Sequence, residues 1–323
     1  MPRAGPHEWV QRLLAITARG RILRGMILLA SDLRPPRAGG DDPLLRLAAD
    51  AGADGLHLAG GCDLEMLARV AASAIRVGVG VASLALPLPE RPLPAGRRLP
   101  RLVAHARDER EASIALALRG LEAAAPLGAR HAVVDCGDVS LAVRPGELAR
   151  AFARAEMDED EAGDRIRAAV LAERRARGDE IGDACRWALE RLLRAAERAG
   201  VTLALPVGAT PWQVPSPREA RLVLDAFAGA PVGLVWDPGR LSVLAALGLA
   251  ISDDRLRGLA DGAVLALEND AVGIEAGLLP GLGERDARVA AIGAPMSVPR
   301  VVTGRADSTD AEVAAAVRAT RPG

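Results

Sequence analysis

The chain of 323 residues contains no lysine and no tyrosine, and aromatic residues make up only 2% of it. The absence of lysine excludes Schiff-base catalysis and a lysine-dependent phosphate loop, and the absence of tyrosine excludes a phenolic acid or base. All strongly basic side chains are therefore arginines. Half of the residues are hydrophobic, so a large core is expected, built from Ala, Leu and Val.

Cysteine is also scarce. Cys62, Cys136 and Cys185 are odd in number and widely spaced, which is typical of a reduced cytosolic protein rather than a disulfide framework or a zinc finger. The longest apolar run near the start, Met26–Ala30, is too short for a signal-peptide core or a membrane span. We therefore expect a soluble, cytoplasmic protein that does not bind membranes.

Neither sign of charge is in excess. Formal net charge is −1, and arginines alternate with acidic residues along the chain, which argues against a nucleic-acid-binding surface. No GxGxxG motif follows the first expected strand, so no nucleotide cofactor is predicted. A small molecule is the expected partner.

Short apolar segments alternate with amphipathic ones along the chain. Between residues 195 and 240, for example, a helix ending in Ala-Gly leads to an apolar strand, a Pro-rich loop, a helix and a second strand that ends in an acid. Continuous apolar strands of this kind are typical of a parallel sheet buried on both faces. The pattern predicts eight strands: Met26–Ser31, Asp54–Leu58, Arg76–Leu84, His131–Asp135, Val201–Pro206, Val232–Asp237, Ala263–Glu268 and Pro299–Thr303.

Helices are expected between these strands. The predicted ones include Glu8–Ala18, Pro43–Asp50, Leu64–Ala74, Glu109–Ala125 and Asp310–Ala319. The proline-rich segment Leu86–Arg101 is expected to be an extended loop. The fold class is therefore α/β. We predict a single (β/α)8 TIM barrel over residues 1–323, with an N-terminal helical extension (1–24) and a helical insertion after the fourth strand (145–200).

Several segments resemble the xylose isomerase-like barrels, the superfamily of sugar-phosphate isomerases and epimerases that also includes endonuclease IV. The similar segments are LRLAADAGADGLHLAG, LEAAAPLGARHAVVDCGD, AAERAGVTLAL, PVGLVWDPGR and LLPGLGERD. Their order and spacing agree with the family over most of the chain. The resemblance implies a barrel whose active site lies at the carboxyl-terminal mouth.

The resemblance also implies a divalent metal, manganese, zinc or magnesium, held by four side chains from strands five to eight. Of these positions only Asp237 keeps its acid. Strand five ends in Pro206 instead of glutamate, and Arg240 replaces the histidine of the strand-six motif. Leu267 stands where the family has a histidine, and Thr303 or Gly304 stands where it has a second glutamate. A metal is therefore expected only if the site has been rebuilt around Asp237.

Three acids are candidate catalytic residues. Asp237 ends the sixth strand, where barrel enzymes place their chemistry; the alternative is an acid that caps the following turn or pairs with Arg240. Asp135 ends the fourth strand, with turn capping as its alternative. Glu268 is the third candidate, with Asp270 beside it. A shift of one residue reverses which face a strand residue occupies, and the sequence does not fix this for either acid.

Four residues are candidates for binding a substrate. His57 lies near the end of the second strand, with a hydrogen-bonded core histidine as the alternative. Trp212 lies in the loop after strand five, where it would cover a sugar face. Arg240 and Arg305 both follow strand ends and would bind carboxylate or phosphate; alternatively, each pairs with a nearby acid, Asp237 or Asp307.

Other residues are expected to be structural. Trp236 should point into the helical layer, because it neighbours Asp237 on the strand. His131 starts its strand and should lie at the opposite end of the barrel from the site. Cys136 is interpreted as a small buried hydrophobe, and the acidic run Met157–Asp164 as a solvated turn.

Three hypotheses remain open. The chain is a divergent isomerase or epimerase of a small polyhydroxylated metabolite, using carboxylate proton transfer, or a catalytically degenerate barrel that binds a ligand or a homologous partner subunit. The third hypothesis is a metal-free enzyme in which Arg240 and Arg305 stabilise an anion. Homo-oligomers are common in the family, whereas a role in DNA repair is not expected, because the surface is not basic.

Overall fold

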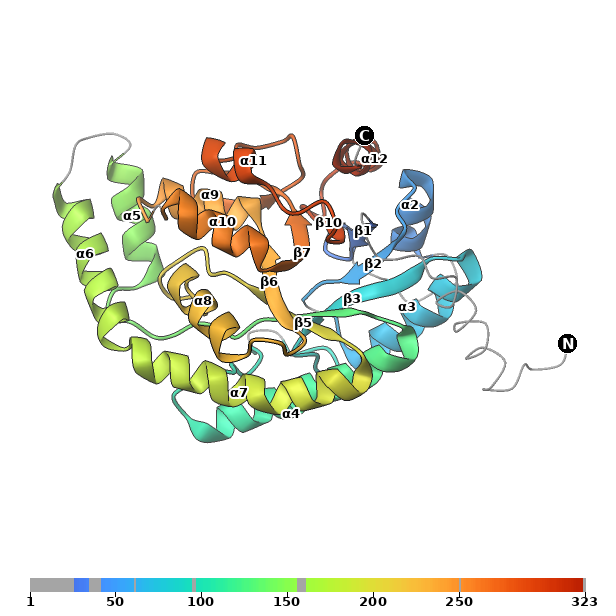
Figure 1. Ribbon diagram of the computed structural model, residues 1–323. Coiled ribbons are helices and arrows are strands. Elements are labelled where there is room, and N and C mark those ends of the chain that lie inside the picture. Colours follow the sequence, from blue (N-terminus) through green and yellow to red (C-terminus); the bar gives the residue numbers. More distant parts are fainter. Residues whose placement is uncertain are drawn as a thin grey trace, which may run out of the picture.

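Eight parallel strands form a closed barrel in the computed structural model, which describes residues 26–34, 42–60, 62–94, 97–155, 161–249 and 251–321. Around the barrel the strands follow the order β1-β10-β7-β6-β5-β4-β3-β2 (Figure 1). The TIM-barrel prediction is therefore confirmed. The expected extension 1–24, with its helix Glu8–Ala18, lies outside the described residues.

The barrel strands match the eight predicted segments. They are β1 (Ile27–Ala30), β2 (Gly55–Leu58), β3 (Gly80–Leu86), β4 (His131–Val134), β5 (Thr202–Pro206), β6 (Val232–Trp236), β7 (Ala263–Glu268) and β10 (Arg300–Val302). A small antiparallel hairpin, which the sequence patterns did not predict, separates the last two: β8 (Asp270–Val272) and β9 (Glu275–Leu278).

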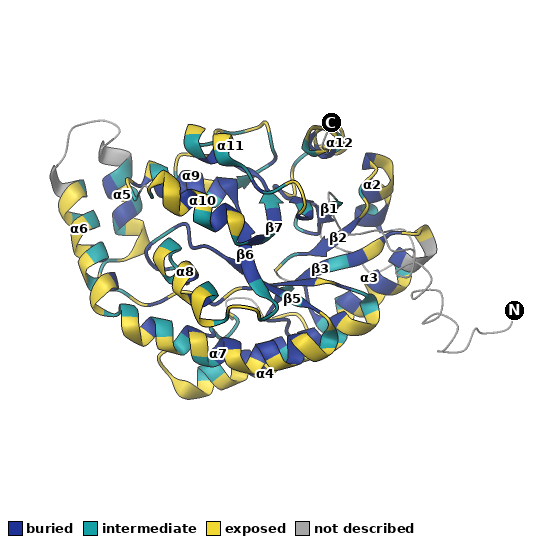
Figure 2. Ribbon diagram, in the orientation of Figure 1, coloured by how far each residue is buried: buried dark blue, intermediate teal, exposed yellow. Residues whose placement is uncertain are grey.

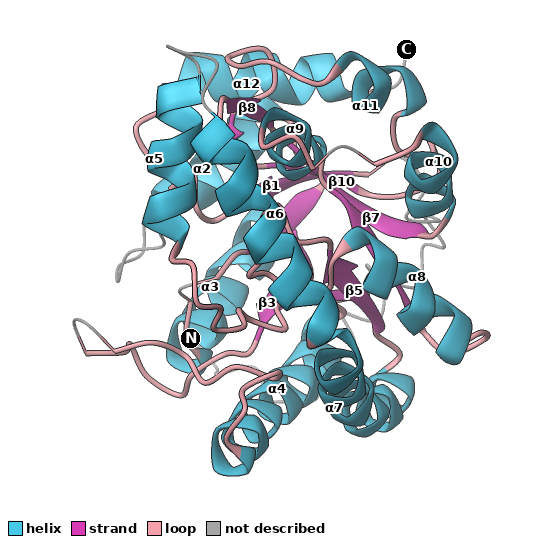
Figure 3. Ribbon diagram, turned by 90° about the vertical axis from the view of Figure 1, so that its left-hand side faces the viewer, coloured by secondary structure: helices cyan, strands magenta, loops and turns pink. Residues whose placement is uncertain are grey.

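Helices surround the strands in the view of Figure 3. They are α2 (Pro43–Ala51), α3 (Leu64–Val77), α4 (Arg107–Leu127), α5 (Pro145–Ala155), α6 (Glu161–Ala176), α7 (Gly178–Ala199), α8 (Pro217–Ala226), α9 (Pro238–Ala246), α10 (Asp253–Asp261), α11 (Ala287–Ile292) and α12 (Asp310–Thr320). In the part of the chain that is described, none of these helices is both long and apolar enough to cross a membrane.

The start of the third predicted strand is wrong. Arg76 belongs to α3, which continues to Val77 and ends before Gly78. Gly78 has a φ of +76°, the left-handed conformation that ends helices and that glycine adopts without steric cost. The strand therefore begins four residues later than predicted, at Gly80, and runs on to Leu86.

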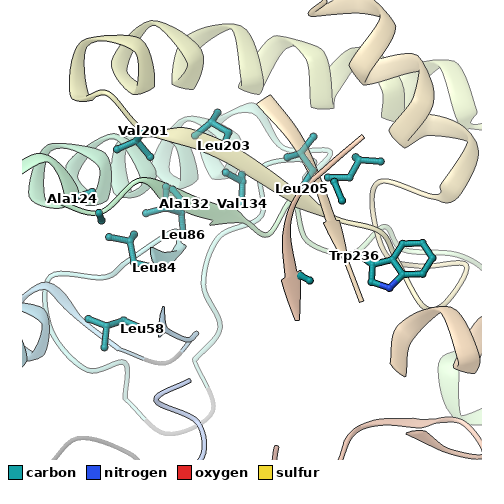
Figure 4. Packing of buried hydrophobic residues seen from close by; sticks show 14 of the residues in the cluster. Leu58, Leu84, Leu86, Ala124, Ala132, Val134, Val201, Leu203, Leu205 and Trp236 are labelled. Carbon is teal, nitrogen blue, oxygen red and sulfur yellow. The ribbon is translucent and has the colours of Figure 1, made fainter. Parts of the chain in front are cut away.

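Strand side chains alternate between the barrel interior and the layer between barrel and helices, as a pleated strand requires. Leu28 and Ala30 belong to the interior cluster, whereas Ile27 and Leu29 join the outer one. Trp236 packs in the outer layer, as predicted, among the residues drawn in Figure 4. The strands are mostly buried, and the exposed residues gather on the outer faces of the helices (Figure 2). This alternation shows which residues at the strand ends face the mouth.

The predicted insertion after the fourth strand is confirmed as the helices α5, α6 and α7. The long helix α7 packs along α4 on the outside of the barrel (Figure 1). The pair α5 and α6 instead covers the loop after β5 and the helix α9. Leu148 and Val170 of this pair form one apolar cluster with Trp212 and Val243.

Candidate functional site

Inward-facing polar side chains occupy the carboxyl-terminal ends of four neighbouring strands. In strand order around the barrel they are Asp32 after β1, Thr303 after β10, Asn269 after β7 and Asp237 after β6. Each lies two residues beyond an interior side chain of its strand, so the alternation turns it toward the barrel axis. We call these four residues the polar arc.

Asp237 is almost completely buried, at 4% exposure. Its Oδ1 accepts hydrogen bonds from the backbone N–H of Arg240 at 3.0 Å and from Asn269 Nδ2 at 3.1 Å. Its Oδ2 lies 3.4 Å from Nε of Arg240. The two structural interpretations of Asp237, as a helix cap and as a partner of Arg240, are both confirmed. Its catalytic role stays a prediction.

Asn269 fits beside Asp237 because a glycine opposes it. A Cβ added to Gly239, in the first turn of α9, would lie 1.8 Å from Oδ1 of Asn269. The sequence predictions did not include Asn269, although it lies between the candidate acids Glu268 and Asp270. Any side chain at position 239 would push the asparagine away from Asp237.

Asp32 and Thr303 form the other half of the polar arc. The Thr303 hydroxyl donates to Asp32 Oδ2 at 2.5 Å, while Asp32 Oδ1 is buried and has no hydrogen-bond partner among the described residues. Burial raises the pKa of Asp32, and the hydrogen bond from Thr303, followed by the backbone N–H groups of Leu33 and Asp32, opposes this rise. Sequence reasoning missed Asp32 because its strand was expected to end at Ser31. The acid directly after that apolar run was the available signal.

Asp135 lies two strands away from Asp237, at the end of β4, and is exposed. Its Oδ1 accepts from the backbone N–H of Gly137 at 2.8 Å, so the turn-capping interpretation is confirmed. Nearby, burial and then the charge of Asp135 raise the pKa of Asp138, whereas Arg101 and Arg240 oppose this rise. Asp135, Asp138 and Arg240 thus share one electrostatic environment on this side of the mouth.

Glu268 points away from the mouth. It alternates with interior Leu267 and lies on the outer face of β7, where it forms ion pairs with Arg300 and, at 3.3 Å, with Arg285. Asp270 shares this face. Its carboxylate pairs with Arg285 Nε at 2.5 Å and accepts from the backbone N–H of Gly281 at 2.5 Å. These two acids therefore fix the loop after the hairpin, and neither reaches the polar arc.

His57 and His131 both face the interior of the barrel. His57 pairs with interior Ala30 in the strand register, and His131 lies two residues before interior Val133 on β4. His57 Nδ1 is 2.6 Å from Oγ of Ser83, so its alternative interpretation as a hydrogen-bonded core histidine is confirmed. Burial lowers the pKa of each histidine to about 4, which keeps both rings neutral at pH 7. His57 lies one layer below the mouth.

Trp212 and Arg305 lie away from the polar arc. The Trp212 ring is 6% exposed, packs under α5 and α6, and donates through Nε1 to the carbonyl of Val143 at 3.1 Å. Arg305 is exposed and pairs with Glu275 of the hairpin at 3.1 Å. The alternative partner expected for it, Asp307, is not the one that the structure records.

A metal centre of the family type does not fit these side chains. Pro206 offers no donor, Glu268 is neutralised by two arginines on the outer face, and Arg240 holds a fixed positive charge beside Asp237. Within the described ranges, no three His, Cys, Asp or Glu side chains lie together as a cation site requires. The donor set left at Asp237 is that of a hydrogen-bonding site.

Barrel closure and strand order define a (β/α)8 barrel with a polar arc at its carboxyl-terminal mouth. No family model and no curated protein matches the sequence. Solved structures match it over nearly the whole chain. Their sequence identities are so low that the likeness establishes the fold and nothing further.

Three of these structures illustrate the likeness. A 3-keto-D-glucoside 4-epimerase from E. coli is 15% identical, with 91% of this chain and 98% of that chain covered and a TM-score of 0.60. The IOLI protein with a bound zinc atom is 16% identical, with coverages of 91% and 96% and a TM-score of 0.61. A xylose isomerase domain protein from Planctomyces limnophilus is 13% identical, with coverages of 92% and 95% and a TM-score of 0.56. The expected fold is thereby confirmed.

Proposed function

We propose that the chain is a divergent barrel of the sugar isomerase or epimerase type. It binds a small polyhydroxylated metabolite at the carboxyl-terminal mouth and transfers a proton with carboxyl groups, without the four-ligand metal centre. The observation that carries this proposal is the polar arc, in which four adjacent strands each place a polar side chain at the mouth. Carboxylate and hydroxyl oxygens are suitable acceptors for the hydroxyl groups of such a ligand.

Asp237 and Asp135 are the carboxylates that we assign to the ligand. They follow β6 and β4, and the strand between them ends in Pro206, which has no polar side chain. Asp237 is fixed by Asn269 and Arg240 and is therefore preorganised, whereas Asp135 is open to an entering molecule. The sugar epimerase among the structural neighbours supports the substrate class.

A second candidate function is ligand binding without turnover, as a binding protein or as the partner of an active homologue. It is favoured by the state of Asp237, because both of its carboxylate oxygens already have protein partners. A carboxylate whose oxygens are engaged in this way has fewer lone pairs free to meet a substrate proton. The two functions share the binding site and differ in whether a carbon-bound proton exchanges.

Proton exchange in D2O tests the proposal. The protein is incubated with a panel of ketoses, the loss of the proton signal beside the carbonyl is followed by NMR, and binding is measured by calorimetry. We expect binding and exchange in the native protein, and an exchange rate lowered by about 10²–10⁴-fold in Asp237→Asn. Asp225→Asn, a change at an exposed acid of α8, is the control and should leave the rate unchanged.

The same assay separates the alternatives. Exchange that survives treatment with a chelator supports carboxyl-based transfer, whereas exchange that needs added manganese, zinc or magnesium contradicts it. Binding without exchange favours the second function. No binding to any member of the panel would refute both.

A further inference from the structure

The polar arc has two carboxylates, one at each end. The proposed function uses Asp237, together with Asp135 outside the arc, and leaves the other end of the arc without a role. The other end of the polar arc is formed by Asp32 and Thr303. Strands β1 and β10 are hydrogen-bonded neighbours, with Leu28 beside Val301 and Leu29 beside Val302. Thr303 or Gly304 stands where the resemblance implies a glutamate, and a carboxyl group from the next strand, that of Asp32, is bound to Thr303.

This pair is held in place by the loops around it. Arg34 donates to the carbonyls of Ala306 at 3.0 Å and Ser308 at 2.5 Å, and it pairs with Asp310 at 2.6 Å. These bonds tie the loop after β1 to the loop after β10. The contact between the loops is close, since a Cβ on Gly304 would lie 3.0 Å from the Leu33 side chain. Neither Asp32 nor Thr303 can shift far from the other.

We propose that Asp32 is a second proton-transfer residue of the mouth, which acts as a neutral acid on the carbonyl oxygen of an α-hydroxy ketone. This assignment rests on the proposed function. The observation behind it is Asp32 Oδ1, a buried oxygen without a hydrogen-bond partner among the described residues, in a carboxyl group whose other oxygen is bound by Thr303. A buried polar atom left unpaired is costly, and a ligand oxygen at this point would pair with it.

The step balances without any co-reactant. Asp237 removes the proton from the carbon beside the carbonyl, and the electron pair of that C–H bond forms the C=C bond of an enediol. The carbonyl π electrons move to oxygen, which takes the proton from Asp32 Oδ1. Asp32 is left as a carboxylate that accepts from Thr303. When the enediol collapses, the protonated Asp237 returns its proton to a carbon of the C=C bond, whose electron pair forms the new C–H bond, while an enediol hydroxyl gives its proton to Asp32 and becomes the carbonyl oxygen of the product.

The surroundings of Asp32 favour its neutral form. The charged and titratable groups around it are Arg34 on its own loop, Cys62 and Asp63 after β2, and the neutral His57 in the layer below. The guanidinium donors of Arg34 go to backbone carbonyls and to Asp310. Burial also raises the pKa of the neighbouring Cys62 thiol, which a hydrogen bond with Ser31 opposes, so this side of the mouth is shielded from water.

The experiment repeats the deuterium exchange with Asp32→Asn, which keeps the shape of the side chain and an acceptor for Thr303. We expect the exchange rate to fall by about 10²–10⁴-fold while the ketose still binds. Asp63→Asn is the matched control. Asp63 is a buried acid of the neighbouring loop whose Oδ1 accepts from the backbone N–H of Met66 at 2.7 Å, and asparagine caps helices equally well.

A second variant covers the case in which Asp32→Asn does not fold. Thr303→Val removes the hydrogen bond that favours the charged carboxyl, so Asp32 should stay protonated to higher pH and the alkaline fall of the exchange rate should move upward. An unchanged rate in Asp32→Asn, or an unmoved pH profile in Thr303→Val, overturns the role of Asp32 and leaves the proposed function standing. Absence of exchange in the native protein overturns both.

Discussion

The geometry of the mouth depends on a single close approach between two residues. Asn269 holds Asp237 from β7, and it does so because Gly239 leaves room for its amide. Gly239 lies in the first turn of α9, and in a helix alanine is normally favoured over glycine. Its presence here is explained by the neighbouring side chain rather than by the backbone.

Gly239→Ala should therefore destabilise the protein instead of stabilising it. The added methyl group would overlap Asn269 Oδ1, and overpacking of this kind costs about 1–3 kcal/mol. The displaced amide would release Asp237, so ligand affinity should fall as well. Urea unfolding and calorimetry measure the two effects.

Gly182→Ala is the matched control. Gly182 lies in the second turn of α7 with open space where a Cβ would be, so this change should stabilise by about 0.4–1 kcal/mol. The double variant Gly239→Ala/Asn269→Ala should recover part of the lost stability but not the affinity. Gly239→Ala that is as stable as the native protein would contradict the packing argument.

Sequence patterns predict where an acid stands at the end of a strand more easily than they predict which face of the strand its side chain occupies. Asp237 was found because it follows an apolar strand and precedes a Pro-Gly turn. The direction of Glu268 depends on pairing between β6 and β7, whose register shifts between Leu234 and Val235. No local pattern encodes that shift, or the two arginines that hold the acid on the outer face.

The insertion helices show the same limit at the scale of elements. Residues 145–200 were predicted to be helical because helix formation depends on residues that are close together in the sequence. The position of Trp212, in contrast, depends on how α5 and α6 fold back over the loop after β5. The hairpin of β8 and β9 was missed because its strands have only three and four residues, too few to show an alternation of polar and apolar residues.

One buried ion pair fastens the insertion to the barrel. Arg174 of α6 is 6% exposed and donates to Glu219 of α8 at 2.6 Å, while its Nε and Nη1 have no partner among the described residues. Glu219 also completes the capping box of α8 with Ser216. Burial lowers the pKa of Arg174, and the nearby Glu219 opposes this effect.

Glu219→Gln should cost more stability than Arg174→Met. Glutamine still completes a capping box, but it leaves the Arg174 charge buried and uncompensated, which costs about 3–5 kcal/mol. Methionine removes the charge and fills the same space, and such replacements are often neutral or stabilising. Urea unfolding midpoints decide the order. Glu65→Gln, in an exposed pair with Arg69, should leave the midpoint unchanged, and the reverse order for the two buried changes would contradict this account.

At the scale of the whole molecule, the barrel interior is the part most sensitive to acid. Ser83 of β3 pairs with both His57 of β2 and His131 of β4 in the strand register, so the two histidines flank one strand of the closed wall. The pKa of each is lowered to about 4 by burial, whereas an unfolded chain has histidine near its ordinary value of about 6.5. Protonation of either ring therefore requires the barrel to open or to bury a charge.

The free energy of unfolding should fall as pH drops from about 6.5 toward 4. In this window the unfolded chain binds protons at both positions and the folded chain does not, so each histidine removes about 1.4 kcal/mol per pH unit. Above pH 7 both states are neutral and stability should no longer change through these groups. Urea unfolding at several pH values measures the slope, and His57→Gln/His131→Gln should flatten it between pH 6.5 and 4, since glutamine does not titrate. A slope that persists in the double variant would assign the acid sensitivity to the carboxyl groups of the mouth instead of to the wall of the barrel.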